Sequence, residues 1–183
     1  YGGRARLRRY RQLLDRIDDP ELRDAVAESY HKLLTYKDEY EVARMLLESE
    51  AKARDRFDGD FRLTWNLAPP LLPGRDANGR PRKRAFGPRF RPVFRLLAGL
   101  RFLRGTPFDP FGYTAERRME RRLIRQYAAD IDRLLARPPA NPAAALALAR
   151  LPLTIRGFGP VKMANAKAAA AERERLIAAL DRV

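Results

Sequence analysis

The chain has 183 residues, enough to bury one hydrophobic core, and its hydrophobic content of 45% excludes wholesale disorder. It contains no cysteine, which excludes disulfides, thiolate nucleophiles and cysteine-ligated iron–sulfur clusters from this chain. A formal net charge of +15 makes nucleic acid the first partner to consider.

The N-terminal third is predicted to be helical. Apolar residues at helical spacing predict a short helix over 4–18 and a long helix over 21–56. Asp18, Asp19 and Pro20 separate the two, because proline suits the first turn of a new helix. The only histidine, His31, lies on the long helix, and its isolation favours a surface position over a metal or acid–base role.

The hydrophobic period changes after Gly59. Four apolar residues alternate with polar ones over 60–67, which is strand spacing, and two prolines end the strand. Because a lone strand is not stable, we predict a hairpin of 60–67 with 82–87, with its turn at Asn78-Gly79.

The hairpin region is also the most basic part of the chain. The stretch 75–104 holds ten basic residues and one acidic residue, Asp76. Its segment 80–91 interleaves arginines with two phenylalanines, as single-strand binders do, although phenylalanines in a return strand more often belong to the core. We favour docking of this patch on an acidic protein surface over binding of nucleic acid.

The C-terminal half is predicted to contain helices over 91–103, 115–136, 142–151 and 160–182. Thr114 is expected to cap the second of these, with Glu116 in its first turn. The predicted fold class is mainly α: one helical domain over 1–183 with a small β-hairpin, α+β at most.

Two candidate contacts lie in the long helix. Lys37 and Asp38 either form an ordinary exposed arc of charge pairs with Glu41 and Arg44 or project toward a partner domain or a substrate channel. On the first interpretation the pairs contribute only a few tenths of a kcal/mol each.

The loop over 105–112 offers a second candidate. Its prolines and glycines predict an ordered loop that joins two helices through buried Phe108 and Phe111. On the alternative interpretation, Arg104 and Thr106 bind an anion or an interdomain carboxylate.

The glycine-rich turn before the last helix resembles a phosphate-binding turn, since glycines expose backbone N–H groups at a helix N-terminus. Pro160 removes one such donor, and no strand precedes the turn. We therefore favour a plain connector, with Lys162 solvated and Arg156 at most an anion contact.

The chain shows no targeting or membrane signal. No apolar run approaches the roughly 20 residues of a membrane helix, and no secretory segment is present, so we expect a cytoplasmic protein. The first residue is Tyr1 rather than Met, and we expect the chain to be a fragment of a larger protein.

Five motifs, in order, resemble the C-terminal domain of the indolepyruvate (2-oxoacid) ferredoxin oxidoreductase family. They are YKDEYEVAR over 36–44, LAPP over 67–70, RGTPFDPFG over 104–112, ERRMERR over 116–122 and IRGFG over 155–159. The resemblance extends over about 10–180. The chain has Pro160-Val161-Lys162 where the family usually has His-Val-Lys, so no histidine role is carried over.

The resemblance implies a parent enzyme that converts aryl 2-oxoacids to acyl-CoA. Its upstream domains, in the same chain, would hold thiamine diphosphate, magnesium and 4Fe-4S clusters and pass electrons to ferredoxin, within a homodimer. The resemblance implies that this chain has a structural role and contains no catalytic, cofactor-binding or metal-binding residue. Its candidate interdomain or anion contacts are Lys37, Asp38, Arg104, Thr106, Arg156 and Lys162. The alternative is a free-standing basic helical module that binds nucleic acid.

Overall fold

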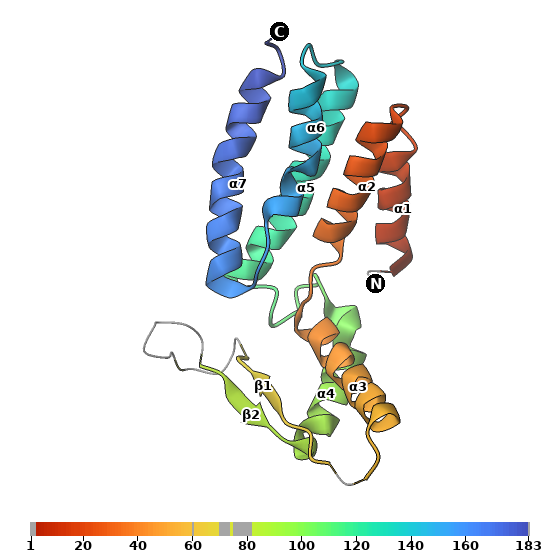
Figure 1. Ribbon diagram of the computed structural model, residues 1–183, viewed down its shortest axis with the longest axis vertical. Coiled ribbons are helices and arrows are strands. Elements are labelled where there is room, and N and C mark those ends of the chain that lie inside the picture. The colour runs from red at the N-terminus through yellow and green to blue at the C-terminus, as the bar shows by residue number, and fades with distance from the viewer. Residues whose placement is uncertain (1–2, 60, 70–73, 75–81, 183) are drawn as a thin grey trace. The chain divides into compact units, whose positions relative to one another are not determined.

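The computed structural model describes residues 3–59, 61–69, 74 and 82–182 (Figure 1). The chain divides into two compact units: unit 1 comprises 1–36 and 118–183, and unit 2 comprises 37–117. Each unit has a hydrophobic core of its own. The predicted fold class, mainly α with a small β-hairpin, is confirmed. That the two units fold as one domain stays a prediction.

In the part that the structure describes, unit 1 consists of helices and the loops that join them and contains no strand. Its helices lie side by side in Figure 1 and surround a core whose centre is Val26, Ile131, Leu148 and Ala149. The elements are α1 (Gly3–Leu14), α2 (Pro20–Leu34), most of α5 (Ala115–Ala136), α6 (Pro142–Arg150), the 3-10 helix η3 (Leu151–Thr154) and α7 (Gly159–Ala179).

The first helix is shorter than the predicted 4–18. After Leu14 the backbone forms 3-10-type hydrogen bonds between residues three apart. The Arg16 N–H donates to the Leu13 carbonyl, and the Ile17 N–H donates to the Leu14 carbonyl. Asp19 then starts α2, because its carboxylate accepts a hydrogen bond from the Leu22 N–H at 3.0 Å.

The predicted long helix over 21–56 is wrong, because the chain forms two helices there. The first, α2, ends at Leu34, where the Thr35 hydroxyl donates to the His31 carbonyl at 2.8 Å. The second, α3 (Glu39–Arg56), begins after Asp38, whose side chain accepts from the Glu41 N–H. An aspartate that bonds the backbone in this way favours a helix start over a helix interior.

Unit 2 combines α3 with a hairpin and a second helical segment. Strands β1 (Trp65–Leu67) and β2 (Arg84–Phe86) pair antiparallel with Trp65 opposite Phe86. The segment after β2 consists of the 3-10 helix η1 (Pro88–Phe90), α4 (Arg91–Gly99) and the 3-10 helix η2 (Leu100–Leu103). The predicted hairpin is thus confirmed with a shorter ladder, and its predicted turn at Asn78-Gly79 lies outside the described residues.

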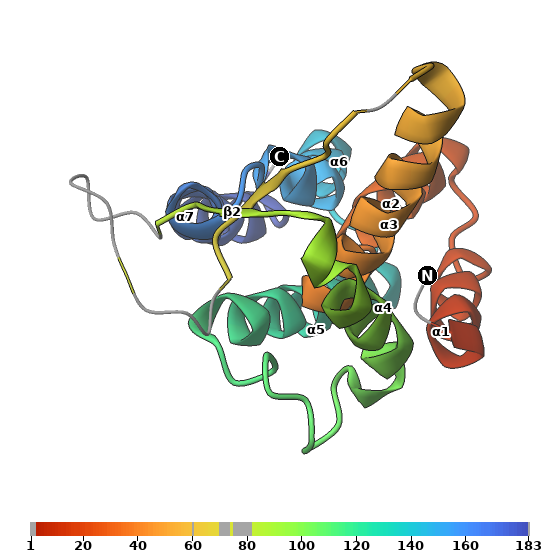
Figure 2. The same ribbon diagram turned by 90° about the horizontal axis from the view of Figure 1, so that it is seen from below.

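The core of unit 2 lies between the hairpin, α3 and α4. Figure 2 shows α4 alongside α3, as Figure 1 does. The Trp65 ring meets the Phe94 ring edge-on at 5.1 Å between centroids, and both side chains are buried with Phe86 and Ala43. Trp65 is the only tryptophan of the chain, so its fluorescence reports on unit 2.

The remaining predicted helices are confirmed within a few residues. The predicted helix over 91–103 is α4 followed by η2, and the helix over 115–136 has the predicted bounds. Among the described residues, none of the helices has both the length and the apolar composition that crossing a bilayer requires.

Candidate functional site

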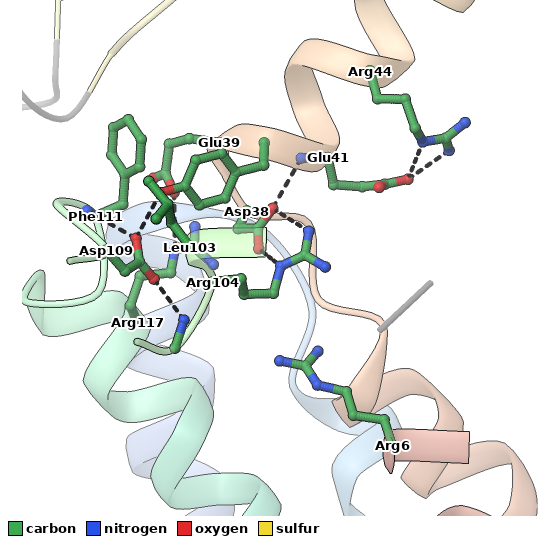
Figure 3. Close-up of polar contacts among 12 residues, drawn as sticks. Arg6, Asp38, Glu39, Glu41, Arg44, Leu103, Arg104, Asp109, Phe111 and Arg117 are labelled. Carbon is green, nitrogen blue, oxygen red and sulfur yellow. Dashed lines mark hydrogen bonds and ion pairs between the residues drawn. The ribbon is translucent and has the colours of Figure 1, made fainter. Parts of the chain in front are cut away.

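Residues from three of the five motifs meet inside unit 2, in a group of side chains that we call the polar junction. It contains residues from the start of α3, from the loop after η2 and from the first turn of α5, most of them labelled in Figure 3. Its members are Asp38, Glu39, Tyr40, Arg104, Asp109 and Arg117.

The first contact of the polar junction is a buried ion pair. Asp38 is only 3% exposed, and the Arg104 guanidinium donates to both of its carboxylate oxygens, with Nη2 to Oδ1 at 2.8 Å (Figure 3). Two such hydrogen bonds fix the orientation of the guanidinium relative to the carboxylate and also strengthen the contact. Because Asp38 also caps α3, this one carboxylate ties the helix start to the loop after η2.

A second buried carboxylate, that of Asp109, closes the loop over 105–112. Its Oδ2 accepts from the Gly105 N–H at 3.0 Å, and its Oδ1 accepts from the Phe111 N–H at 3.2 Å. The same Oδ1 accepts from the Tyr40 hydroxyl at 3.0 Å. The carboxylate therefore has three donors and connects its own loop to α3.

Tyr40 is held as a neutral phenol. Burial and the hydrogen bond to Asp109 both raise the pKa of Tyr40 well above its ordinary value. Its ring meets the Phe111 ring edge-on at 5.4 Å between centroids. The hydroxyl thus serves as a donor to Asp109, and the ring fills the space beneath the loop.

Glu39 and Arg117 complete the polar junction. Their closest charged atoms, Oε2 of Glu39 and Nε of Arg117, are 3.4 Å apart, and both side chains are largely buried. Burial raises the pKa of Glu39, and the positive charge of Arg117 opposes that rise. The Thr114 hydroxyl accepts from the Arg117 N–H at 3.3 Å, which confirms the predicted cap of α5.

The other predicted contacts of unit 2 lie around the polar junction. Lys37 is exposed. Glu41 pairs with Arg44 one turn later, as predicted, and the hydrogen bond from Arg44 lowers the pKa of Glu41. The predicted exposed arc is wrong for Asp38, which is buried, and Glu41 and Arg44 are only partly exposed. Thr106 is exposed, and its hydroxyl donates to the Leu103 carbonyl at 2.7 Å and accepts from the Phe108 N–H.

The prediction that Phe108 and Phe111 are both buried is half wrong. Phe111 is buried, whereas Phe108 is 80% exposed. The carboxylate of Asp109 occupies the inner side of the loop, and Phe108 is left on its outer side.

In unit 1 the glycine-rich turn also differs from its prediction. Lys162 is not solvated but pairs with the buried carboxylate of Glu120 on α5. Arg156 is exposed, and its Nε donates to the Leu153 carbonyl at 3.2 Å. Gly157 has φ of 91°, and a Cβ there would lie 2.8 Å from Val161 Cγ1, so the turn requires glycine.

Sequence reasoning missed a third cation beside this turn, Lys32 of α2. Its Nζ donates to the carbonyls of Pro152 and Leu153 at 2.9 and 2.8 Å. Burial and repulsion from Arg156 and Lys162 lower the pKa of Lys32. No local sequence pattern predicts these contacts, because both partners of Lys32 are backbone carbonyls, 120 and 121 residues later in the chain.

Unit 2 also contains an open pocket of about 340 Å³. The carboxylate of Glu50 lies buried at its edge and accepts from Arg91 Nε and Arg54 Nη2, each at 3.0 Å. Burial alone would raise the pKa of Glu50, but these hydrogen bonds outweigh it, and the pKa lies below its ordinary value.

This lowered pKa predicts an acid-sensitive unit 2. The stability that the Glu50 carboxylate provides is complete above the unfolded pKa of about 4.3 and is lost as pH falls through the lower folded pKa. We expect Glu50→Gln to be less stable at neutral pH and to lose less stability below about pH 4.3. Urea unfolding followed by Trp65 fluorescence over a pH series measures this. Glu48→Gln, at an exposed site on the same helix, is the control, and an unchanged acid response of Glu50→Gln would contradict the assignment.

The residues that the structure describes offer no site for the metal groups that the resemblance implies for the parent enzyme. In the described part of the chain, no three His, Cys, Asp or Glu side chains are placed to hold a metal ion. The chain also has no cysteine to ligate a 4Fe-4S cluster.

Comparison with known proteins finds one family. The sequence profile of a family of unknown function, DUF6537, matches residues 1–175 and so spans both units. No curated protein matches the chain. No solved structure matches it either.

Proposed function

The chain belongs to the DUF6537 family, and from this premise we propose that it is a non-catalytic structural and interface domain of a larger enzyme. By its five motifs, that enzyme resembles the indolepyruvate ferredoxin oxidoreductases. The proposal places the chain in the cytoplasm, beside upstream catalytic domains of the same polypeptide.

The polar junction carries this proposal. Three motif residues of the polar junction are buried or nearly buried: Asp38, Arg104 and Asp109. The Asp38–Arg104 ion pair and the hydrogen bond from the Tyr40 hydroxyl to Asp109 join the start of α3 to the loop after η2. Asp109 also accepts from the Gly105 N–H of its own loop. A catalytic carboxylate must reach a substrate proton or atom within hydrogen-bond distance. Carboxylates whose oxygens already accept two or three internal hydrogen bonds are suited to holding a loop and a helix together.

In the proposed enzyme the reaction belongs to other domains. Thiamine diphosphate with magnesium would activate the aryl 2-oxoacid, and 4Fe-4S clusters would carry electrons to ferredoxin, none of them bound by this chain. The parent would form a homodimer. What this chain contributes is an ordered surface, since the Asp38–Arg104 ion pair and the Asp109 carboxylate anchor the loop over 105–112. Its basic residues then face an acidic neighbour.

The proposal is tested by reading the gene upstream of the codon for Tyr1 and assaying the whole product. We expect an open reading frame that encodes a thiamine diphosphate loop and cluster cysteines. The purified product should reduce ferredoxin when supplied with indolepyruvate and coenzyme A, and this chain expressed alone should not.

Turnover of the 2-oxoacid by this chain alone would overturn the proposal. So would a gene whose product contains no thiamine diphosphate loop or cluster cysteines.

A further inference from the structure

An apolar ridge runs along the outer side of the segment that follows β2. It consists of every third residue from Phe90 in η1, through α4, to Phe102 in η2. Residues three apart are neighbours on an α-helix and eclipse one another on a 3-10 helix, so each member of the ridge adjoins the next. Because three residues turn an α-helix through about 300°, the ridge winds obliquely around α4. Its members are Phe90, Val93, Leu96, Gly99 and Phe102, and each of them is exposed.

The exposure of this ridge is unusual for such side chains. Leu96 is 62% exposed and Phe102 is 71% exposed, whereas the opposite side of α4 buries Phe94 against Trp65. Scattered exposed apolar residues need no explanation, but contiguous ones are typical of an interaction surface.

Three arginines flank the ridge at different points along it. Arg89, Arg95 and Arg101 each directly precede a ridge residue and are exposed. Within the described residues, none of the three forms an ion pair with an acidic side chain. Arg91 differs, since it turns to the buried Glu50. The stretch 88–104 contains no acidic residue of its own.

We infer that this ridge, with the exposed arginines that flank it, is a docking surface for an acidic amphipathic helix of a partner protein. Ridges of residues three apart fit the grooves of a facing helix. An arginine guanidinium binds a carboxylate through two parallel hydrogen bonds, so glutamates beside the apolar face of the docked helix complement the flanking arginines, with Arg95 next to the central Leu96. The inference names the partner of the interface role and to that extent rests on the proposed function.

The chemistry of the ridge disfavours other occupants. A second copy of this chain would bring its own arginines against these in an isologous contact, which is repulsive. Nucleic acid stacks on aromatic faces, and the centre of the ridge is Val93 and Leu96, which have none.

The test measures binding of synthetic peptides to the whole chain by fluorescence anisotropy. The probe is a helical peptide of about 18 residues, long enough to cover the ridge, with leucines on one face and glutamates beside them. A second peptide has lysines in place of the glutamates. We expect the acidic peptide alone to bind, and Leu96→Asp and Arg95→Glu each to weaken its binding about tenfold or more.

Matched controls lie in unit 1, where α1 also presents an exposed leucine beside arginines. Leu7→Asp and Arg8→Glu make the same chemical changes at exposed positions of α1 and should leave the affinity within about twofold. Equal weakening by Arg8→Glu would overturn the inference, because the attraction would then reflect net charge alone. Hydrogen exchange of the wild-type chain should show protection by the peptide over 89–102, and protection elsewhere only would also overturn it.

Three further outcomes contradict the inference. They are preferential binding of a single-stranded oligonucleotide, preferential binding of anionic phospholipid vesicles, and self-association of the chain that Leu96→Asp abolishes. The enzyme assay of the whole product is independent of these measurements. A missing upstream reading frame would therefore defeat the proposed function, whereas unchanged peptide affinity in the ridge variants would defeat the docking surface alone.

Discussion

Replacing Asp38 by asparagine is expected to lower the free energy of unfolding of unit 2 by about 3 kcal/mol, because the largely buried Arg104 guanidinium loses its counter-charge. The asparagine retains the ability to cap α3, so this variant isolates the ion pair. Asp38→Ala should cost about 1 kcal/mol more, since it also removes the cap. Urea unfolding followed by Trp65 fluorescence measures both.

Asp19 is the matched control for this experiment, and because it lies in unit 1, the unfolding of its variants is followed by far-ultraviolet circular dichroism of the helices. It caps α2 through the same kind of bond, to the Leu22 N–H, but at an exposed position without a buried arginine. We expect Asp19→Asn to change stability by a few tenths of a kcal/mol and Asp19→Ala to cost about 1 kcal/mol. Equal effects of Asp19→Asn and Asp38→Asn would show that the ion pair adds nothing to the cap.

Asp109→Asn is the second substitution with a large expected effect, again about 3 kcal/mol. All three partners of the Asp109 carboxylate are donors: the N–H groups of Gly105 and Phe111 and the Tyr40 hydroxyl. An amide presents an NH₂ group to at least one of them, which leaves a donor unsatisfied and sets two donors against each other. The near-isosteric change should therefore open the loop over 105–112.

Tyr40→Phe measures how much of the effect of Asp109→Asn comes from the hydrogen bond of the Tyr40 hydroxyl alone. It removes one of the three hydrogen bonds and keeps the ring against Phe111, so it should cost only about 1 kcal/mol. Hydrogen exchange of the Gly105 and Phe111 amides identifies the loop directly: both should exchange faster in Asp109→Asn and little faster in Tyr40→Phe. Unchanged protection of both amides in Asp109→Asn would contradict the closure that we assign to Asp109.

Elements with their own local signals could be predicted from the sequence. The hairpin followed from the alternation around Trp65 and from the need of a strand for a partner. The start of α5 followed from Thr114, which bonds a backbone amide three residues later. In these cases the residues that determine the element lie within it.

The break between α2 and α3 was missed although a local signal exists. The apolar stripe through Tyr36, Tyr40 and Ala43 continues across the break and favours one long helix. The spacing of Asp38 and Glu41, a capping residue followed three positions later by glutamate, is typical of a helix start and outweighs the stripe. Buried Tyr36 and Tyr40 therefore belong to different units.

The polar junction itself could not be predicted from one sequence. Asp38 and Arg104 are 66 residues apart, and Tyr40 and Asp109 are 69 residues apart. Charged residues are frequent in this chain, so no local pattern selects the partner of a given carboxylate. The same holds for Lys162, whose partner Glu120 is 42 residues away.

A double-mutant cycle on Asp38 and Arg104 tests most directly whether the motif residues are engaged with one another. The cycle compares Asp38→Asn, Arg104→Gln and the double variant by urea unfolding with Trp65 fluorescence. We expect the double variant to be little worse than either single one, with a coupling energy of about 2 kcal/mol or more. Additive effects would contradict the account, since the two side chains would then act independently and be available to a substrate or partner.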